Sequence, residues 1–487
     1  MSHVANVPFY RRVEDALAKT RMRQAVKHTS GRAMESRRAA IAELDSADAV
    51  RDQARAIRAR TLSELDRHLD TFVTNVEKNG GTVFFAETGD DAVDYIRRLA
   101  RDRGVKTIVK GKSMVSEEIE LNPVLEGDGF EVVETDLGEY IVQLDDDKPS
   151  HIVAPILHKT KEDCARVFKE KLGASDEDVA GVPQMTQLAR RTLRKAFLKA
   201  DMGITGVNFG VAETGSVTIC TNEGNGRLSS SLPRVYVAMM GMERLVPTAA
   251  DLGVMLQVLG RSGTGQRLTV YSNILSGPRR SGPDGGEADG PEEFHVVIVD
   301  NGRSEVLASE LAEILYCIRC GACLYACPVY QQIGGHAYGS VYSGPVGSVL
   351  SPALSGIHAF HDLPHASTLC GACREVCPVR IDIPRMLLRL RARGVEAGES
   401  PQWVSLGIKV LGWIGTRPRL FGLAGRVAAR VAGVAATDGW IRELPGHLAG
   451  WTATRDFPAP AAESFTERWA RTHPSSPGTS AGTRGAS

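Results

Sequence analysis

Residues 317–330 read CIRCGACLYACPVY and place four cysteines in the order C-x2-C-x2-C-x3-C, directly before Pro328. Residues 367–379, STLCGACREVCPV, repeat this run with three cysteines, again with a proline after the last one. When the two runs are aligned on their Cys-Pro pairs, Ser367 stands where the first run has Cys317. Seven of the chain's nine cysteines therefore belong to one internal repeat.

The spacing of this repeat indicates iron–sulfur clusters rather than disulfides or zinc. A secreted disulfide scaffold would be short and rich in cysteine throughout, and this chain of 487 residues is neither. Zinc ribbons pair two C-x2-C knuckles and do not add a third close cysteine and a Cys-Pro pair. In the bacterial ferredoxin motif, three closely spaced thiolates bind one cluster, and the cysteine before the proline binds the other. The repeat therefore predicts a two-cluster ferredoxin-type module.

The crossed ligation of this motif assigns the seven cysteines to two clusters. The first cluster receives a full set of four ligands: Cys317, Cys320, Cys323 and Cys377. The second receives three: Cys327, Cys370 and Cys373. A [4Fe–4S] cluster takes four thiolates. We therefore expect the second cluster to be a [4Fe–4S] cluster whose fourth ligand is not a cysteine. The alternative is a [3Fe–4S] cluster. Candidates for that ligand are Ser367, water or a partner protein, because Cys164 and Cys220 lie outside the module and are typical of small buried thiols.

The composition is that of a soluble globular protein with two or three domains. Hydrophobic residues make up 43% of the chain and charged residues 24%. The 58 acidic and 58 basic residues balance, so no overall field draws the chain to nucleic acid. The N-terminal sequence has no apolar run typical of a signal peptide, and no stretch is long and apolar enough to cross a bilayer. We therefore expect a cytoplasmic protein whose contact with a membrane is at most peripheral.

Changes in composition along the sequence predict five segments. They are a helical segment at 1–75, an α/β domain at 76–304, the cysteine module at 305–395, a C-terminal extension at 396–470 and a disordered tail at 471–487. Strands of the α/β domain are expected at 81–88, 105–111, 130–136, 139–144, 151–157 and 295–303, with helices such as 90–103 and 161–173 between them. This alternation predicts a mainly parallel sheet with helices on both faces. A surface loop is expected at 276–293 and a helix at 304–317.

Polar residues outside the cysteine module offer weaker candidates for ligand binding. The turns around the strand SVTIC at 216–220 contain Glu213, Thr214, Gly215, Asn222, Glu223, Gly224 and Asn225, and a second group contains Lys110, Lys112 and Ser113. Backbone N–H groups in such turns can bind an anion, but glycine and asparagine are more often present there because they allow positive φ. His336 is expected to be a packed loop histidine rather than a ligand of the second cluster. No dinucleotide fingerprint, Walker motif or nucleophile elbow is present, so we assign no catalytic residue.

Four separated blocks of the sequence resemble the lactate utilisation protein B family, in the same order and over nearly the whole chain. The stretches 110–126, 132–144 and 149–159 are similar to the first half of a lactate-utilisation (LUD) domain, and 206–228 and 232–248 to its second half. The two cysteine runs with their surroundings, 317–350 and 363–384, are similar to the ferredoxin module of the family. GWTATRDFPAPAAESF at 450–465 resembles its C-terminal signature.

The resemblance implies a fold and a function. The fold is an α/β LUD domain of the NagB/RpiA/CoA-transferase-like class with an N-terminal helical segment, followed by an α-helical two-cluster module and a C-terminal helical extension. The function is that of the iron–sulfur electron-transfer subunit of a complex that oxidises L-lactate to pyruvate and allows growth on lactate. Its partners would be two sister subunits, one a cysteine-rich-domain iron–sulfur protein and one a second LUD protein, and a respiratory electron acceptor. The family pattern has the same seven cysteines.

Two other functions are weighed against this one. A self-contained hydroxy-acid oxidoreductase would bind its substrate in the LUD domain and pass electrons to the clusters, but it would need a flavin or nicotinamide motif that the sequence lacks. A redox sensor would usually carry a DNA-binding helix-turn-helix, which is not evident either. The stretch 403–433, apolar with five basic residues, is expected to dock on a partner subunit rather than on a membrane surface.

Overall fold

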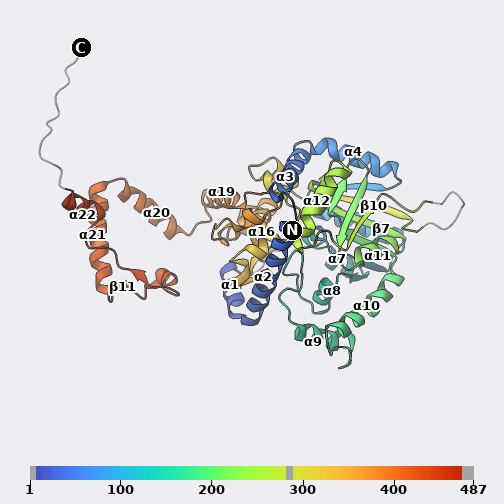
Figure 1. Ribbon diagram of the computed structural model, residues 1–487, viewed down its shortest axis with the longest axis horizontal. Coiled ribbons are helices and arrows are strands. Elements are labelled where there is room, and N and C mark those ends of the chain that lie inside the picture. Colours follow the sequence, from blue (N-terminus) through green and yellow to red (C-terminus); the bar gives the residue numbers. More distant parts are fainter. Residues whose placement is uncertain (1–6, 281–288, 474–487) are drawn as a thin grey trace, which may run out of the picture. The chain divides into compact units, whose positions relative to one another are not determined.

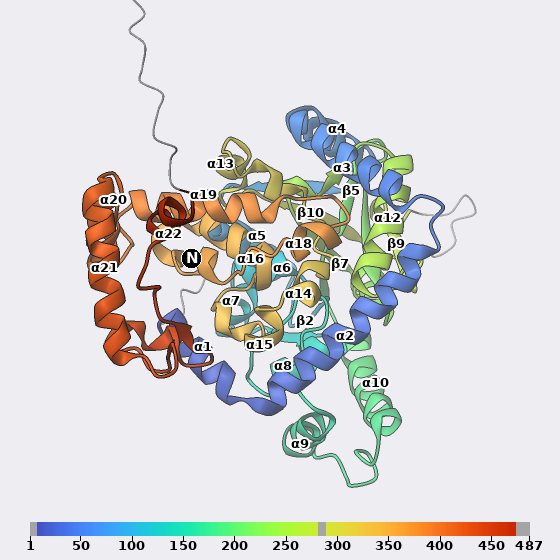
Figure 2. The same cartoon turned by 60° about the vertical axis from the view of Figure 1, so that its left-hand side comes forward.

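The computed structural model describes residues 7–280 and 289–473, and the chain divides into two compact units that meet between Glu399 and Ser400. The first unit contains the N-terminal helices, the α/β domain and the cysteine runs (Figures 1 and 2). The second unit contains the remaining helices and two short strand pairings.

The N-terminal segment is helical, as the sequence predicts, in four pieces: α1 (Phe9–Ala18), α2 (Thr20–Ala42), α3 (Ala47–Ser63) and α4 (Leu65–Lys78). Helix α3 begins at Ser46, whose hydroxyl accepts a hydrogen bond from the backbone N–H of Ala49. Helix α4 ends before Gly80, which has a φ of +90° and turns the chain into the first strand. Figure 2 shows that α2 crosses beside the short helices of the cysteine module.

The main sheet has six strands, all parallel, in the order β1-β10-β7-β4-β2-β3. Their bounds are β1 (Thr82–Ala86), β2 (Thr107–Lys110), β3 (Glu131–Glu134), β4 (Met202–Gly206), β7 (Val235–Gly241) and β10 (Glu293–Val299). The predicted parallel sheet is thus confirmed, and so are the strands expected within 81–88, 105–111, 130–136 and 295–303.

Helices cover both faces of this sheet, because alternate residues of its central strands point to opposite sides. Tyr236 and Met240 of β7 belong to a core that they share with α4 and α12 (Ala249–Gly263). Val237 and Met239 belong to a second core with α5 (Gly89–Asp102) and α7 (Leu121–Gly127). The remaining helices of the domain are α6 (Met114–Glu118), α8 (Leu137–Leu144), α9 (Lys161–Leu172), α10 (Val182–Lys199), α11 (Asn225–Ser231) and the 3-10 turn η1 (Met242–Arg244).

Two expected strands are wrong. Residues 139–144 belong to helix α8, which begins at Asp136, whose carboxylate accepts hydrogen bonds from the N–H groups of Gly138 and Glu139. Residues 151–157 form turns. A short apolar run does not distinguish a buried strand from a buried helix, and only the aspartate cap before 137 favours the helix. A second sheet, β8-β5-β6-β9, lies within 209–275, with β5 (Phe209–Val211), β6 (Ser216–Thr221), β8 (Leu245–Val246) and β9 (Tyr271–Leu275).

The cysteine module consists of short helices joined by turns. Its elements are α13 (Arg303–Leu307), η2 (Ala312–Tyr316), α14 (Ala322–Ala326), α15 (Tyr330–Ile333), η3 (His336–Tyr338), α16 (Gly344–Ser355), α17 (Ile357–Phe360), η4 (Leu363–His365), α18 (Ala372–Val376) and α19 (Ile383–Glu396). The single helix expected at 304–317 is wrong, because the chain leaves the helix after Leu307 and re-forms only a 3-10 turn from Ala312. The apolar core of α4, α12 and β7 continues into this module.

The second unit contains α20 (Gln402–Gly415), α21 (Pro418–Ala435), β11 (Trp440–Ile441), η5 (Gly446–Trp451), β12 (Phe457–Pro458) and α22 (Phe465–Thr472). Most large apolar side chains of α20 and α21 are exposed, among them Trp403, Trp413 and Phe421. The tail predicted from 471 begins inside α22, and residues 474–487 lie outside the described residues, as do 281–288 of the loop expected at 276–293. No helix in the described ranges is long and apolar enough to cross a membrane.

Candidate metal centre

The two cysteine runs have the same local backbone. Gly321 of the first run and Gly371 of the second have φ values of +76° and +84°, and each begins a five-residue helix, α14 or α18. Arg319 and Leu369, at equivalent positions before the second cysteine, also have positive φ values of 59° and 56°. Such a conformation is uncommon for residues with a Cβ. The repeat in the sequence is therefore a repeat in three dimensions, and α14 and α18 pack against each other.

Four cysteine side chains meet around one small cavity of about 20 Å³. Three come from the first run, and the fourth, Cys377, comes from the end of the second run; the set is Cys317, Cys320, Cys323 and Cys377. The other lining residues are mostly apolar, including Ile318 and Val346, and Arg319 is the one charged residue among them. This is the set of four that the crossed motif assigns to the first cluster.

The other three cysteines of the repeat, Cys327, Cys370 and Cys373, are close enough to influence one another electrostatically. Burial, with the charge of Cys327 next, raises the pKa of Cys373 to about 12. Cys370 is exposed, whereas Cys327 and Cys373 are buried. The hydroxyl of Ser367 accepts a hydrogen bond from the N–H of Leu369 at 3.1 Å, so this serine is engaged within its own loop.

The spacing of the sulfur atoms fits a cluster better than a single zinc ion. Four thiolates at about 2.3 Å from one zinc ion lie roughly 3.8 Å apart. Among the described residues, the one group of three or more metal-binding side chains whose ligand atoms lie within 4.8 Å of one another is Asp147, His158 and His336, which contains no cysteine. The cysteine sulfurs are therefore spread more widely, as ligands at the corners of an iron–sulfur cube must be.

Backbone N–H groups point at several of these sulfurs. The N–H of Arg319 lies 3.4 Å from Sγ of Cys317, that of Tyr330 lies 3.5 Å from Sγ of Cys327, and that of Ile381 lies 3.4 Å from Sγ of Cys377. Hydrogen bonds of this kind stabilise thiolates and raise the reduction potential of a bound cluster.

Arginines from outside the module hold the loop backbones, and the sequence analysis missed them. Arg37 of α2 donates to the carbonyl of Val376 at 2.8 Å, and Arg51 of α3 donates to that of Cys377 at 2.9 Å. Arg58 of α3 is fully buried and donates to the carbonyls of Leu245 and Leu315 at 2.6 and 2.9 Å. The arginine-rich composition of 9–75 was the available signal, but arginines on a helix are far more often solvated.

Burial makes these thiols reluctant to ionise without a metal. It raises the pKa of Cys320 to about 12 and that of Cys377 to about 11. Thiolates are the ligands that iron requires, so cluster assembly must displace protons from these side chains. The exposed Cys370 differs, because the N–H of Ala372 and the Thr368 side chain lower the pKa of its thiol.

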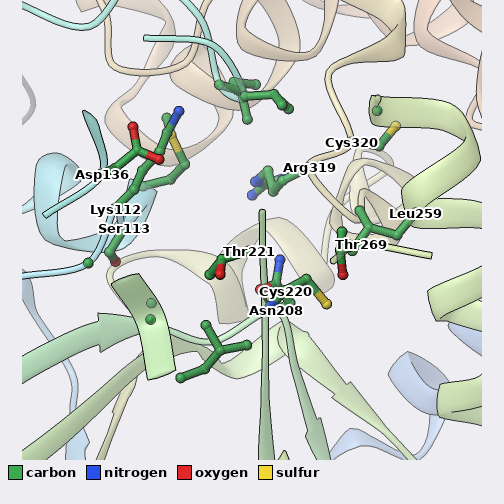
Figure 3. A pocket seen from close by; sticks show the side chains of 18 of the residues that line it. Lys112, Ser113, Asp136, Asn208, Cys220, Thr221, Leu259, Thr269, Arg319 and Cys320 are labelled. Carbon is green, nitrogen blue, oxygen red and sulfur yellow. Dashed lines mark hydrogen bonds between the residues drawn. The ribbon is translucent and has the colours of Figure 1, made fainter. Parts of the chain in front are cut away.

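A larger cavity of about 500 Å³ lies beside the first cysteine group (Figure 3). It opens where β2, β3, β4 and β7 end, the edge at which open parallel sheets usually bind ligands. Lys112 and Ser113 follow β2, Asp136 follows β3, and Arg319 and Cys320 come from the first cysteine run. In Figure 3, Lys112, Ser113 and Asp136 lie on one side, Leu259, Thr269 and Cys320 on the other, and Arg319 between them.

The other candidates from the sequence fall into two groups. Asn222, Glu223 and Asn225 line the large cavity together with Lys112, Ser113 and Cys220. Glu213, Thr214 and Gly215 do not; a Cβ on Gly215 would lie 2.4 Å from the backbone of Asn75, so this turn packs on α4. Lys110 is buried in an ion pair with Glu134 at 2.7 Å, and Cys164 packs in a separate core with α9.

His336 does not join the cysteines. Its Nε2 lies 2.7 Å from the carbonyl oxygen of Lys148, and its ring packs edge-on against His158, with ring centroids 4.5 Å apart. The expectation of a packed loop histidine is only partly met, because His336 is exposed and begins the 3-10 turn η3.

Comparison with known proteins identifies the families to which the α/β domain and the cysteine module belong. Residues 69–299 match the family model of the LUD domain, 313–381 match that of the 4Fe-4S dicluster domain, and 392–473 match that of the lactate utilisation protein B C-terminal region. These matches define an iron–sulfur protein in which a LUD domain adjoins a dicluster module.

Curated relatives extend this match to nearly the full length. Lactate utilization protein B of Geobacillus thermodenitrificans is 49% identical over 470 residues, covering 96% of this chain and 97% of the relative. The protein of the same name from Bacillus subtilis is 47% identical over 464 residues, covering 95% and 96%. The chain belongs to the lactate utilisation protein B family. A DUF162 family protein of Deinococcus radiodurans aligns at 11% identity and a TM-score of 0.27, covering 48% of this chain and 98% of that one.

Proposed function

We propose that this protein is the electron-transfer subunit of a complex that oxidises L-lactate to pyruvate, and that electrons pass through two iron–sulfur clusters. Cys317, Cys320, Cys323 and Cys377 would hold the first cluster, and Cys327, Cys370 and Cys373 the second. The observation that carries the proposal is the meeting of Cys377 with the three cysteines of the first run around one cavity. This crossing links the two runs and brings two clusters into one small module.

The proposal assigns a role to each part of the chain. The helices of 1–75 support the cysteine loops, the domain at 76–304 carries the large cavity, and the module at 305–395 carries electrons. The extension at 396–470 would dock on a sister subunit, since its helices expose many large apolar side chains, among them Trp403, Leu406, Leu411, Trp413 and Phe421. The partners would be a cysteine-rich-domain iron–sulfur protein, a second LUD protein and a respiratory acceptor.

Anaerobic reconstitution tests the cluster assignment. The full chain is loaded with iron and sulfide, both are counted, and EPR spectra are taken after reduction with dithionite. Two clusters predict about seven or eight iron atoms per chain and two interacting signals. About four iron atoms per chain would overturn the two-cluster assignment.

Addition of L-lactate tests the direction of electron flow. The loaded chain is mixed with L-lactate with and without the sister subunits, and cluster reduction is followed by EPR. We expect reduction only when the sister subunits are present, because this chain carries no flavin or nicotinamide motif. Reduction by L-lactate in the isolated chain would favour the self-contained oxidoreductase instead.

A further inference from the structure

Two histidines and one aspartate meet outside the two cysteine groups. Asp147 and His158 lie in the segment between α8 and α9, and His336 begins the 3-10 turn η3 of the cysteine module. One ligand atom from each of the three lies within 4.8 Å of those of the other two. Imidazole nitrogens and a carboxylate oxygen are common ligands of divalent transition metals, so this group is a candidate for a further metal site.

Each histidine has one ring nitrogen engaged by a polar partner outside the group. Nε2 of His336 donates to the carbonyl oxygen of Lys148 at 2.7 Å. The hydroxyl of Ser150 donates its single proton to the carbonyl of Pro155 at 3.1 Å, so it accepts from Nδ1–H of His158 at 2.7 Å. Histidines that bind metals almost always donate their second ring N–H in this way. Nδ1 of His336 and Nε2 of His158 are then the nitrogens left for a metal.

The remaining nitrogen of His158 faces a carboxylate. Its Nε2 lies 2.9 Å from Oδ2 of Asp147. In a neutral ring with its proton on Nδ1, Nε2 carries a lone pair, and a carboxylate oxygen is an acceptor as well. Two acceptors at this distance repel each other unless a positive charge lies between them. Either a second proton on the ring or a metal ion supplies that charge, so the pair requires a cation.

Asp147 is held by neighbours in the way that a ligating carboxylate usually is. Its Oδ1 accepts from the N–H of Lys148 at 2.7 Å, and its Oδ2 lies 2.7 Å from Nζ of Lys159. The charge of Lys159 is shared with Asp145, whose Oδ2 lies 2.6 Å from the same nitrogen. Outer hydrogen bonds of this kind orient the ligands of a metal ion. All three side chains of the group therefore have a supporting partner.

The group lies at the wall of a second cavity, which has a volume of about 660 Å³. Asp147 and His336 both line this cavity, together with Lys148 and Pro149. The side chain of His158 is only 10% exposed, so one side of the group is shielded from water. Three protein ligands beside an open cavity leave coordination positions for water or another oxygen ligand, which is typical of catalytic rather than structural metal sites.

We propose that Asp147, His158 and His336 bind one divalent transition-metal ion through Oδ2, Nε2 and Nδ1, with further coordination positions open to the cavity. The ion would join the LUD domain to the cysteine module, because His336 follows the first cysteine run and the other two ligands lie between α8 and α9. The inference does not rest on the proposed function, since none of the three residues belongs to either cysteine group.

Retention of zinc tests the site, with Zn²⁺ as the probe because it has no redox chemistry. The full chain is reconstituted anaerobically, freed of unbound iron and sulfide, and mixed with Zn²⁺, and both metals are counted after gel filtration. We expect about one zinc ion per chain and no loss of iron. No retained zinc would overturn the proposal and leave Asp147 and His158 as an ion pair only. Zinc gained at the expense of iron would place the ion at the cysteines and would overturn it too.

X-ray absorption at the zinc edge identifies the ligands. Nitrogen and oxygen ligands lie at about 2.0–2.1 Å from zinc, whereas cysteine sulfur lies at about 2.3 Å. We expect only the shorter distance in the unaltered chain, and a sulfur shell there would contradict the assignment.

The variant His336→Cys turns the same spectrum into a positive test. Because His336 is exposed, the substitution should leave the fold in place and add one sulfur at about 2.3 Å. The matched control is His28→Cys, since His28 is exposed on α2 and does not belong to the group. Its spectrum should keep the shorter distance alone. A spectrum of His336→Cys without sulfur would show that residue 336 is not a ligand.

Affinity tests the other two ligands. Asp147→Asn and His158→Gln should each weaken Zn²⁺ binding at least tenfold, measured by competition with a chelating dye, whereas His28→Gln should leave it unchanged. Zn²⁺ should also raise the unfolding temperature of the unaltered chain and not that of the two variants, because a ligand of the folded state stabilises it. Unchanged affinity in both variants, or an equal loss in His28→Gln, would refute the site.

Discussion

Cys320 of the first run and Cys370 of the second hold equivalent positions on the same local backbone, yet Cys320 is buried and Cys370 is exposed. The glycines that follow them show the same contrast. A Cβ on Gly321 would lie 3.1 Å from His151 and Val153, whereas a Cβ on Gly371 would meet nothing within 4 Å. The first run is enclosed by the LUD domain and the N-terminal helices, whereas the second is open at Cys370 and Gly371, although its Cys373 and Cys377 are buried. One repeated motif thus provides two different environments.

This difference indicates what each cluster would do. An enclosed cluster with four thiolates is protected from water, and an exposed cluster with three is accessible to a partner and to oxidants. Exposure and hydrogen bonding also separate the reduction potentials of clusters of the same type. We therefore infer that the first group is the stable, interior half of the electron path and the second the exchangeable, surface half.

Exposure to air gives the largest expected difference between the two halves. Loaded protein held in air should lose the second cluster first and pass through a state with about four iron atoms per chain. Iron content and EPR spectra followed over time measure this. Loss of both clusters at one rate would show that the difference in burial has no consequence.

Substitution of Ser367 by cysteine should reduce that difference. Ser367→Cys restores the eighth cysteine of the repeat, so we expect slower loss of the second cluster in air and a changed EPR signal for it. The signal of the first cluster should stay as it is, because its four cysteines are complete. No change in either signal would mean that residue 367 does not reach the second cluster.

The stability of the LUD domain should depend on pH through the titration of Glu139, and this dependence should be separable from the clusters of both cysteine runs. Burial raises the pKa of Glu139 to about 8, against about 4.3 in an unfolded chain. The folded state binds the extra proton, so stability is highest below the unfolded value and is lost as pH rises toward 8. Between pH 6 and 8 the loss is about 2–3 kcal/mol.

Thermal unfolding at pH 6, 7 and 8 checks this dependence. Glu139→Gln should flatten the slope of the unfolding temperature against pH, and neither EPR signal should change. A slope that persists in Glu139→Gln would assign the titration to another group.

The smallest expected effect concerns the support of the second run by α2. Arg37→Gln removes a buried donor to the carbonyl of Val376, next to Cys377, and should destabilise the protein by about 1–3 kcal/mol. Arg32→Gln, an exposed arginine on the same helix, is the control. Unfolding temperatures and iron retention of the two variants are compared, and equal behaviour would remove the role given to Arg37.

Most of the fold followed from sequence periodicity, and its failures have physical causes. The strands β1, β2, β3 and β10 are short apolar runs with helices between them, a pattern that defines a parallel sheet. Helix α8 carries an equally apolar run, and its identity depends on the capping by Asp136 more than on its hydrophobicity. The helix expected at 304–317 breaks because the chain must turn into the first cysteine loop.

The candidate site was predictable only where its residues are close in sequence. The spacing of the cysteines identifies the two runs, and Gly215 and Gly224 of the turns around 216–220 have the positive φ that was expected there. Arg37, Arg51 and Arg58 come from helices more than 250 residues before the cysteines, so no local pattern connects them. The direction of the Arg319 side chain, toward the LUD domain, also depends on tertiary packing against Glu243 and Tyr342.

The crossed assignment of the two runs is tested most directly by replacing Cys377 and Cys327 in turn. Cys377→Ser should remove or alter the EPR signal of the first cluster, although Cys377 belongs to the second run, and leave that of the second cluster in place. Cys327→Ser should do the reverse. If each substitution instead affects the cluster of its own run, the crossing is wrong, and so is the account of an enclosed and an open half.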